Sequence, residues 1–422
     1  MAFECNRKSC ELRCCDSFNT VFFSNKSYKA LKESRNSDLR RLTRSFILKN
    51  EEAITEFDAY IMESGGKCPM LCEDGSCLVE NVFGAKFMGY PCGSYPGFVR
   101  QVGPYYEEGV SLACPLVAKT VLSQKSGLNF INMQRDVSKD LPARRYTDIR
   151  NVYGNYIQDV KDIGLNILKK RTLEIDVRLF VLTIFYSHLE QLFTNCDAQT
   201  SVFVGLYKDK LADDELRSLL DGYECNLKEQ LVLYYLFGRP LLTSENNDQI
   251  DELLDFAYKF AEGVKMSEMD EFADKYRKAR EQIYQPFMDE HGYILENFLV
   301  NEFFNDALPF LYFKDMQDAT LYFVVYFGML EFMICAMALR DEKIDVPDVY
   351  QLIIRLAKRF EPVSQHFENK YEGRITKDKF KIILGSLENF KLKHLQVILG
   401  LLGKTAKKPE GEEEKKDGEK GK

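Results

Sequence analysis

The sequence predicts a mainly α-helical protein in which an irregular, cysteine-rich, metal-binding N-terminal domain packs on an all-helical C-terminal domain. Nine of the twelve cysteines lie within the first 114 residues, where glycine and proline are also frequent between Gly65 and Pro115. After about residue 150, apolar residues recur at the spacing of helices. We place the cysteine-rich domain at 1–120, the helical domain at 121–403 and a charged tail, expected to be disordered, at 404–422.

The amino-acid composition limits the classes of protein that this sequence can belong to. The 422 residues are 45% hydrophobic and 13% aromatic, which is enough for a sizeable core. The formal net charge of −8 disfavours a nucleic-acid partner, because phosphates would repel it. No signal-like apolar stretch opens the sequence, so we expect a cytoplasmic, reducing location, where disulfides do not explain twelve cysteines.

The N-terminal cysteines form two groups. The first is Cys5, Cys10, Cys14 and Cys15, and the second is Cys68, Cys72, Cys77, Cys92 and Cys114. Thiolates are soft ligands that suit iron–sulfur clusters or zinc. The alternative is a set of ordinary buried cysteines, but core cysteines rarely gather beside Gly and Pro turns. We therefore predict a metal centre, most simply iron–sulfur with zinc as the alternative, bound by members of the set Cys5, Cys10, Cys14, Cys15, Cys68, Cys77, Cys92 and Cys114.

Helical periodicity accounts for most of the remaining sequence. Between the cysteine groups, 27–63 reads as a charged helix. Further on, helices are predicted over 175–193, 227–237, 250–264, 294–304 and 350–360. The stretch from Ala319 to Leu339 is long and apolar enough to span a bilayer, but Glu331 lies inside it. Because a carboxylate in mid-bilayer is costly, we predict a buried core helix and no membrane span. No convincing strand series, Gly-x-Gly-x-x-Gly turn or P-loop is present.

Several motifs together resemble a known family. Cys10-Glu-Leu-Arg-Cys14-Cys15, the segment from Cys68 to Cys77, and Cys92-x-x-Tyr95-Pro96 are similar to the cysteine-rich domain described as zinc- or iron-chelating. Ser111-Leu-Ala-Cys114-Pro115 extends the likeness towards the flagellin lysine-N-methylases of the FliB type. Helical segments at 175–182, 295–304 and 320–339 are similar to that branch as well.

The resemblance implies an enzyme that transfers methyl groups from S-adenosylmethionine to flagellin lysines and carries a cysteine-bound iron–sulfur cluster, most simply 4Fe–4S. The sequence also departs from the family. Where the family has arginines after the Pro-Cys cysteine and after Tyr-Pro, this sequence has Gly93 and Gly97, and Cys72 is an additional cysteine. If those arginines hold an anionic group, this protein does so otherwise or has lost the activity.

Candidate site residues follow from the chemistry that lysine methylation needs. A lysine amine, with a pKa near ~10.4, attacks only when neutral, so a pocket lined by tyrosines and carboxylates suits it. Tyr95 is our candidate catalytic residue, and the alternative is a packed aromatic ring. Asn297 and Asn301 lie four residues apart on one helix face, where they line a cofactor pocket or form a satisfied polar network. The histidines are dispersed and are expected to be structural.

Two further functions remain open at this stage. One is a metal-stabilised, non-catalytic protein-binding module, which the missing arginines favour. The other is a redox protein, which would change its visible absorbance on reduction. The expected partner is flagellin or another protein that presents lysines.

Overall fold

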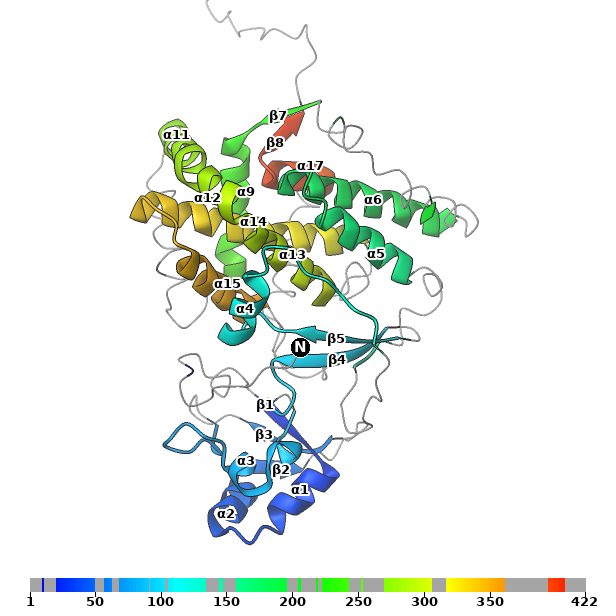
Figure 1. Cartoon of the computed structure of the whole chain (residues 1–422), viewed down its shortest axis with the longest axis vertical. Helices are drawn as coiled ribbons and strands as arrows, with labels where there is room; N and C mark the ends of the chain where they lie inside the picture. The colour runs from blue at the N-terminus through cyan, green and yellow to red at the C-terminus, as the bar shows by residue number, and fades with distance from the viewer. Residues whose placement is uncertain are drawn as a thin grey trace, which may run out of the picture.

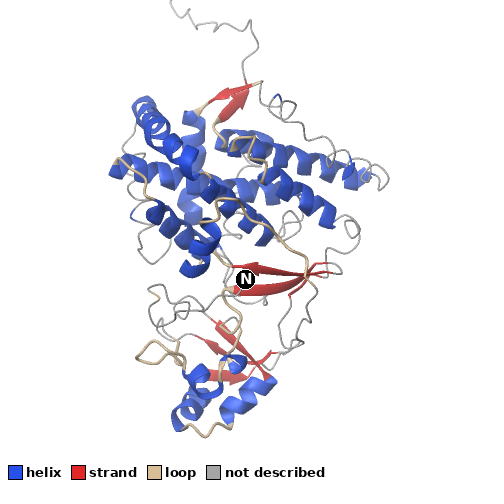
Figure 2. Cartoon of the chain, viewed as in Figure 1, coloured by secondary structure: helices blue, strands red, loops and turns tan. Residues whose placement is uncertain are grey.

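The structure is a computed structural model, and it describes Cys10 and residues 20–49, 57–62, 68–90, 92–102, 105–133, 144–146, 157–195, 204–205, 218, 222–242, 252, 269–305, 316–360 and 394–406. The described parts form a small α/β lobe at one end, a second small sheet in the middle and a helical body at the other end (Figure 1). Figure 2 shows that most strands lie in the first two parts, while helices dominate the third, which carries one short two-stranded ribbon. The chain is therefore mainly helical, as predicted.

The N-terminal lobe is built on an antiparallel sheet of order β1-β3-β2. The strands are β1 (Thr20–Ser24), β2 (Ile47–Lys49) and β3 (Phe57–Met62), accompanied by α1 (Asn25–Lys32), α2 (Ser37–Phe46), α3 (Leu78–Phe83) and the 3₁₀ turn η3 (Ala85–Phe87). The single helix expected over 27–63 is wrong. The Asn36 side chain accepts a hydrogen bond from Leu39 N at 2.9 Å and so starts a second helix. The residues after that helix form β2, which pairs with β3.

A second sheet joins this lobe to the helical body. It consists of β4 (Gly97–Val102), β5 (Tyr105–Val110) and β6 (Arg144–Tyr146), with β4 in the centre. The expectation that the cysteine-rich region is irregular throughout is therefore wrong. The strands are short and carry turn-forming glycines, and β6 pairs with β4 across more than forty residues, so local periodicity does not reveal the pairing.

The helical body confirms most of the predicted helices. Its described elements are α4 (Pro115–Leu122), α5 (Ile157–Leu168), α6 (Ile175–Asn195), α9 (Leu227–Leu242), α11 (Met269–Ala279), η4 (Arg280–Tyr284), α12 (Gln285–His291), α13 (Tyr293–Asn305), α14 (Met316–Asp341), α15 (Val346–Phe360) and α17 (His394–Leu401), with the small ribbon of β7 (Tyr223–Cys225) and β8 (Lys404–Ala406). The helix predicted over 250–264 lies outside the described residues, apart from residue 252.

The long apolar helix α14 lies at the centre of this body. Among the described helices it alone has the length and hydropathy of a membrane span, and its apolar window is wholly buried inside the protein. Helices α6, α9, α11, α15 and α17 all pack against it. A helix that is apolar on every side is expected in the middle of a large core, which confirms the core-helix prediction for this segment.

Two hydrophobic clusters stabilise the described parts. One lies in the N-terminal lobe and runs from Val21 to Val79. The other begins at Leu112 and fills the helical body as far as Leu402. Tyr95 is partly buried and packs against both clusters. The boundary at residue 120 remains a prediction.

Candidate functional site

The turn that follows β5 brings several of the predicted site residues together. Val110, the last residue of β5, pairs with Gly97 at the start of β4. The next residue, Ser111, donates its backbone N–H to the carbonyl of Pro96 at 2.9 Å. The Cys114 N–H reaches the Ser111 carbonyl at 3.4 Å. The segment that carries Tyr95 therefore lies beside the turn that carries Cys114, between the two lobes, and we call this region the junction.

Side-chain amides of α13 hold the junction from the other side. Asn301 Nδ2 donates to the Val110 carbonyl at 3.2 Å, and Asn305 Nδ2 donates to the same oxygen at 2.7 Å. One turn earlier, Asn297 Nδ2 donates to Val121 O at 3.1 Å and to Gln124 O at 2.9 Å. These carbonyls belong to the last turn of α4 and the residues after it, where the C=O acceptors of a helix have no N–H donors within the helix itself. The three asparagines thus bind both ends of the β5–α4 segment to α13.

These contacts bear on the two roles considered for Asn297 and Asn301. The Nδ2 groups of both are engaged by backbone carbonyls, as a satisfied polar network requires. Asn297 is fully buried, and its Oδ1 has no hydrogen-bond partner among the described residues. A role for Asn297 and Asn301 in cofactor binding remains a prediction.

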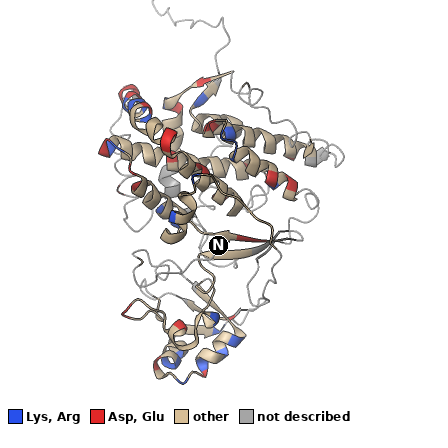
Figure 3. Ribbon diagram, viewed as in Figure 1, with Lys and Arg blue, Asp and Glu red and all other residues tan. Residues whose placement is uncertain are grey.

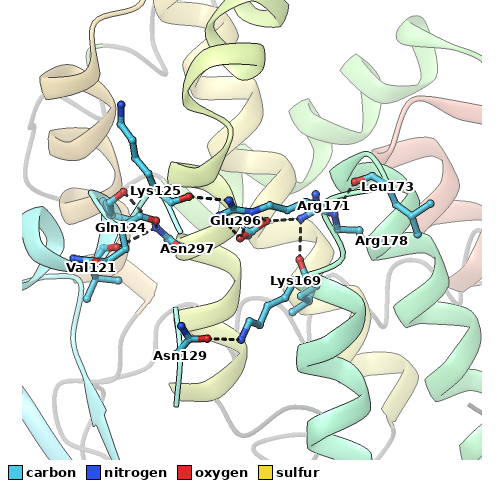
Figure 4. A network of polar contacts seen from close by, with 12 residues as sticks. Val121, Gln124, Lys125, Asn129, Lys169, Arg171, Leu173, Arg178, Glu296 and Asn297 are labelled. Carbon is cyan, nitrogen blue, oxygen red and sulfur yellow. Dashed lines mark hydrogen bonds and ion pairs between the residues drawn. The ribbon is translucent and has the colours of Figure 1, made fainter. Parts of the chain in front are cut away.

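A buried carboxylate beside Asn297 fixes α13 to the helical body (Figure 4). The Glu296 carboxylate is 4% exposed and accepts from Arg171 through Nε at 3.0 Å and Nη2 at 2.8 Å. Arg178 Nη1 donates to the other carboxylate oxygen at 2.9 Å. Burial lowers the pKa of Arg178, and Glu296 opposes that shift. We call these three residues the Glu296 clamp.

The clamp arginines also donate to backbone carbonyls. Arg178 donates to the carbonyls of Leu168 and Leu173, which border the turn between α5 and α6. Arg171 donates to the Lys125 carbonyl, just after α4. The sequence alone assigned no role to Glu296 or to either arginine, since nothing in the local sequence indicates that residues more than a hundred positions apart meet.

The described cysteines of the N-terminal region lie in loops and at helix starts. The loop from Cys68 to Cys77 is a tight turn in which Cys72 N donates to Ser76 O at 2.8 Å and Gly75 takes a positive φ of 80°. Cys77 and Cys114 are the N-cap residues of α3 and α4. Cys68, Cys77 and Cys92 pack against the N-terminal hydrophobic cluster.

The structure does not assemble the predicted metal centre from the residues it describes. Over those ranges, no three His, Cys, Asp or Glu side chains are placed as a metal site. Cys5, Cys14 and Cys15 lie outside the described residues, so the predicted ligand set is only partly placed. The set remains a prediction.

A second buried polar cluster surrounds Glu331 in α14. Arg280 pairs with this carboxylate at 2.9 Å, and the Tyr234 hydroxyl donates to its other oxygen at 3.0 Å. Arg280 begins the π-helical turn η4, a feature that recurs at functional sites. Gln230 donates to Tyr234 Oη at 2.8 Å and to Leu401 O at 2.9 Å, which joins α17 to the same cluster. Glu331, which argued against a membrane span, thus has a guanidinium partner in the core.

Burial changes the acidity of the neutral groups around Glu331. It raises the pKa of the Tyr234, Tyr276 and Tyr284 hydroxyls well above their ordinary value, and the Glu331 charge adds to the shift. Burial likewise raises the pKa of the Cys335 thiol to about 12, with Glu331 adding to it and Arg280 opposing it. These groups stay protonated at neutral pH, so the cluster holds one carboxylate and one guanidinium among neutral partners.

The thiols should differ sharply in their reaction with iodoacetamide. Only the thiolate reacts, and Cys335 is both fully buried and held protonated, whereas Cys225 in β7 is exposed. We expect peptide mass spectrometry of native protein alkylated at pH 8 to find Cys225 modified and Cys335 unmodified. Alkylation in denaturant is the control and should modify both. Equal modification of the two in native protein would contradict the buried placement of Cys335.

Alkaline pH should destabilise the protein through the same cluster. A group with a raised pKa binds more protons in the folded than in the unfolded chain, so the free energy of unfolding falls as pH rises past the unfolded value. That fall begins near pH ~9 for Cys335 and near pH ~10 for the tyrosines, at up to ~1.4 kcal/mol per pH unit for each group. Urea unfolding between pH 8 and 11 measures it, and unchanged stability over that range would contradict the burial of these groups.

Comparison with known proteins identifies the helical body. The model of the FliB lysine N-methylase C-terminal domain matches residues 161–384, more than half of the chain. The flagellar biosynthetic protein FliU of Salmonella muenchen is 24% identical over 145 residues, which are 34% of this chain and 85% of that protein. The lysine-N-methylases of Salmonella typhimurium and Salmonella choleraesuis are each 24% identical over 127 residues, 30% of this chain and 31% of theirs.

The chain therefore matches less than a third of the length of those two lysine-N-methylases. No solved structure matches it. The matched range of the family model contains α13, the Glu296 clamp and the Glu331 cluster. By this match, the chain belongs to the family defined by the FliB lysine N-methylase C-terminal domain.

Proposed function

We propose that this protein is a protein-lysine N-methyltransferase that uses S-adenosylmethionine and acts on flagellin. The observation that carries the proposal is the family match over residues 161–384. The junction supports it, because α13, inside the matched range, hydrogen-bonds the turn that leads to Cys114 and adjoins Tyr95. The proposed active site is this junction.

For methyl transfer, the main task of the protein is to position the lysine amine and the methyl donor. S-adenosylmethionine supplies a methyl group on a sulfonium. The lysine ammonium first gives its proton to water; the Nζ lone pair then forms the new N–C bond as the S–C bond breaks, and the product leaves with S-adenosylhomocysteine. In this scheme the Tyr95 hydroxyl accepts a hydrogen bond from the amine and aims its lone pair at the methyl carbon. Holding the two reactants in that orientation supplies much of the rate.

We propose that the N-terminal thiolates bind an iron–sulfur cluster, with zinc as the alternative, and that this centre orders the cysteine-bearing loops. The donor chemistry supports it, as does the position of Cys77 and Cys114 at helix N-termini, where the peptide dipole favours a thiolate. No step of methyl transfer depends on the centre in this scheme. Anaerobically purified protein is expected to be brown and to contain iron; colourless protein with zinc would replace the cluster by a zinc site, and protein with neither would refute the centre.

Transfer of a labelled methyl group tests the activity. Full-length protein is incubated with methyl-labelled S-adenosylmethionine and purified flagellin, and protein-bound label is counted. Label on flagellin that depends on the protein is the expected result. Label that appears only on the methyltransferase itself, or on no protein, would refute flagellin as the substrate.

A non-catalytic protein-binding module is the second candidate, and Gly93 and Gly97 favour it. Gly93 has room for a side chain, because a Cβ there would lie 3.5 Å from its nearest neighbour. A Cβ on Gly97 would lie 3.3 Å from Ser94 O, a tight contact that requires the carbonyl to shift by a few tenths of an ångström. The double variant Gly93→Arg/Gly97→Arg is therefore expected to fold. Label transfer by this variant, but not by the natural sequence, would establish the second candidate for the natural protein.

A further inference from the structure

The first two helices carry a basic surface on an otherwise acidic chain. Residues 25–49 contain eight Lys and Arg side chains against two acidic ones, although the chain as a whole has a formal net charge of −8. The basic residues are Lys26, Lys29, Lys32, Arg35, Arg40, Arg41, Arg44 and Lys49. All are exposed except Arg40, which is half-buried. We call this set the basic surface.

Few acidic side chains of the described residues neutralise the positive charges of the basic surface. Arg41 faces Asp38 at 3.8 Å, and Arg40 donates to the Ser34 carbonyl at 2.9 Å. Lys26 and Lys32 lie over the rings of Phe87 and Tyr28. Among the described residues, Lys29, Arg35 and Arg44 have neither an acidic partner nor a hydrogen bond from the side chain. Like charges gathered without counter-charges repel one another, so an acidic partner lowers their energy.

The location of the basic surface also suits a large partner. Helices α1 and α2 pack together and sit at the end of the molecule away from the helical body, where Figure 3 shows their blue segments. The proposed active site lies between this lobe and the helical body. A protein bound at the basic surface is large enough to reach the junction with another part of its chain, whereas a small ligand is not.

We propose that the basic surface docks an acidic segment of the protein substrate, separately from the lysine that is methylated. This inference rests on the proposed function. The acidic remainder of the chain disfavours a long nucleic acid, which would run beyond the surface into like charge. Two aromatic residues, Tyr28 and Phe46, occur in residues 25–49, and neither is exposed, so the surface offers no platform for stacking bases. Leu48 is its one large exposed apolar side chain, too little to anchor it in a membrane.

Charge reversal tests the proposal with a matched control. The variant Lys29→Glu/Arg44→Glu alters two basic-surface residues, and Lys119→Glu/Lys278→Glu makes the same change of net charge at exposed positions of α4 and α11. We expect the first variant to bind a fluorescent oligoglutamate peptide and flagellin at least about tenfold more weakly, and the control to bind as the natural protein does. Raising salt from about 0.05 to about 0.3 M should weaken natural binding similarly.

The readouts separate this proposal from the proposed function. Binding is measured without a methyl donor, so the binding result tests the docking proposal whether or not label transfer occurs. Where label transfer occurs, the first variant should raise KM for flagellin with kcat unchanged. Equal binding by the two variants would overturn the proposal, as would tighter binding of a single-stranded oligonucleotide than of oligoglutamate. Dimerisation of the natural protein that the first variant abolishes would assign the surface to a second copy instead and overturn it too.

Discussion

Replacing Glu296 by alanine is expected to lower the free energy of unfolding by about 3–5 kcal/mol. The change leaves Arg178, which is 8% exposed, with a buried charge and no carboxylate, and it frees Arg171 from α13. Losing one partner of a buried ion pair costs far more than the pair itself contributes. Urea unfolding followed by circular dichroism measures the change.

Two further variants show whether the effect comes from the clamp. Glu281→Ala removes an exposed carboxylate from the same part of the chain and should change the free energy of unfolding by no more than about 0.5 kcal/mol. Glu296→Gln keeps the shape and one acceptor oxygen, so a smaller loss than for alanine is expected. A loss below about 1 kcal/mol for Glu296→Ala would show that the arginines find other partners or water.

Replacing Tyr95 by phenylalanine is expected to lower kcat for methyl transfer by about 10²-fold. The substitution removes the hydroxyl that we propose positions the amine, and it keeps the ring, which packs against both hydrophobic clusters. Stability should therefore change little, and KM for flagellin should stay near its natural value.

A tyrosine in the sheet that follows Tyr95 provides the control. Tyr106 in β5 is 48% exposed, and Tyr106→Phe should leave kcat unchanged. If Tyr95→Phe retains full kcat, Tyr95 is a packed aromatic and the hydroxyl has no part in the reaction. A loss of kcat that comes with a lower melting temperature would likewise assign the residue to packing.

Helical periodicity was sufficient to predict most of the helical body. Segments such as 175–193 and 294–304 bury one face or the whole helix, and that burial is visible as apolar spacing. Glu331 was enough to favour a core position over a membrane span for α14, because a core can supply a guanidinium and tyrosine hydroxyls as partners for the carboxylate.

The strands and the clamp could not be predicted in the same way. β4 pairs with β6 from far along the chain, and Glu296 meets Arg171 and Arg178 only after three helices have packed. Such contacts depend on tertiary structure, which a local pattern does not encode. The sequence predicted residues of the junction but not their proximity. Tyr95, Cys114 and Asn301 were identified as candidates, but they lie close together only through hydrogen bonds to the backbone of β5 and the turn after it.

The chemical identity of the product tests the central claim most directly. Flagellin is incubated with the full-length protein and S-adenosylmethionine, digested, and analysed by tandem mass spectrometry. We expect peptides that gain the mass of one or more methyl groups, with the fragment ions placing each gain on a lysine side chain. Flagellin whose lysines are all unmodified, although the protein is folded, would contradict it.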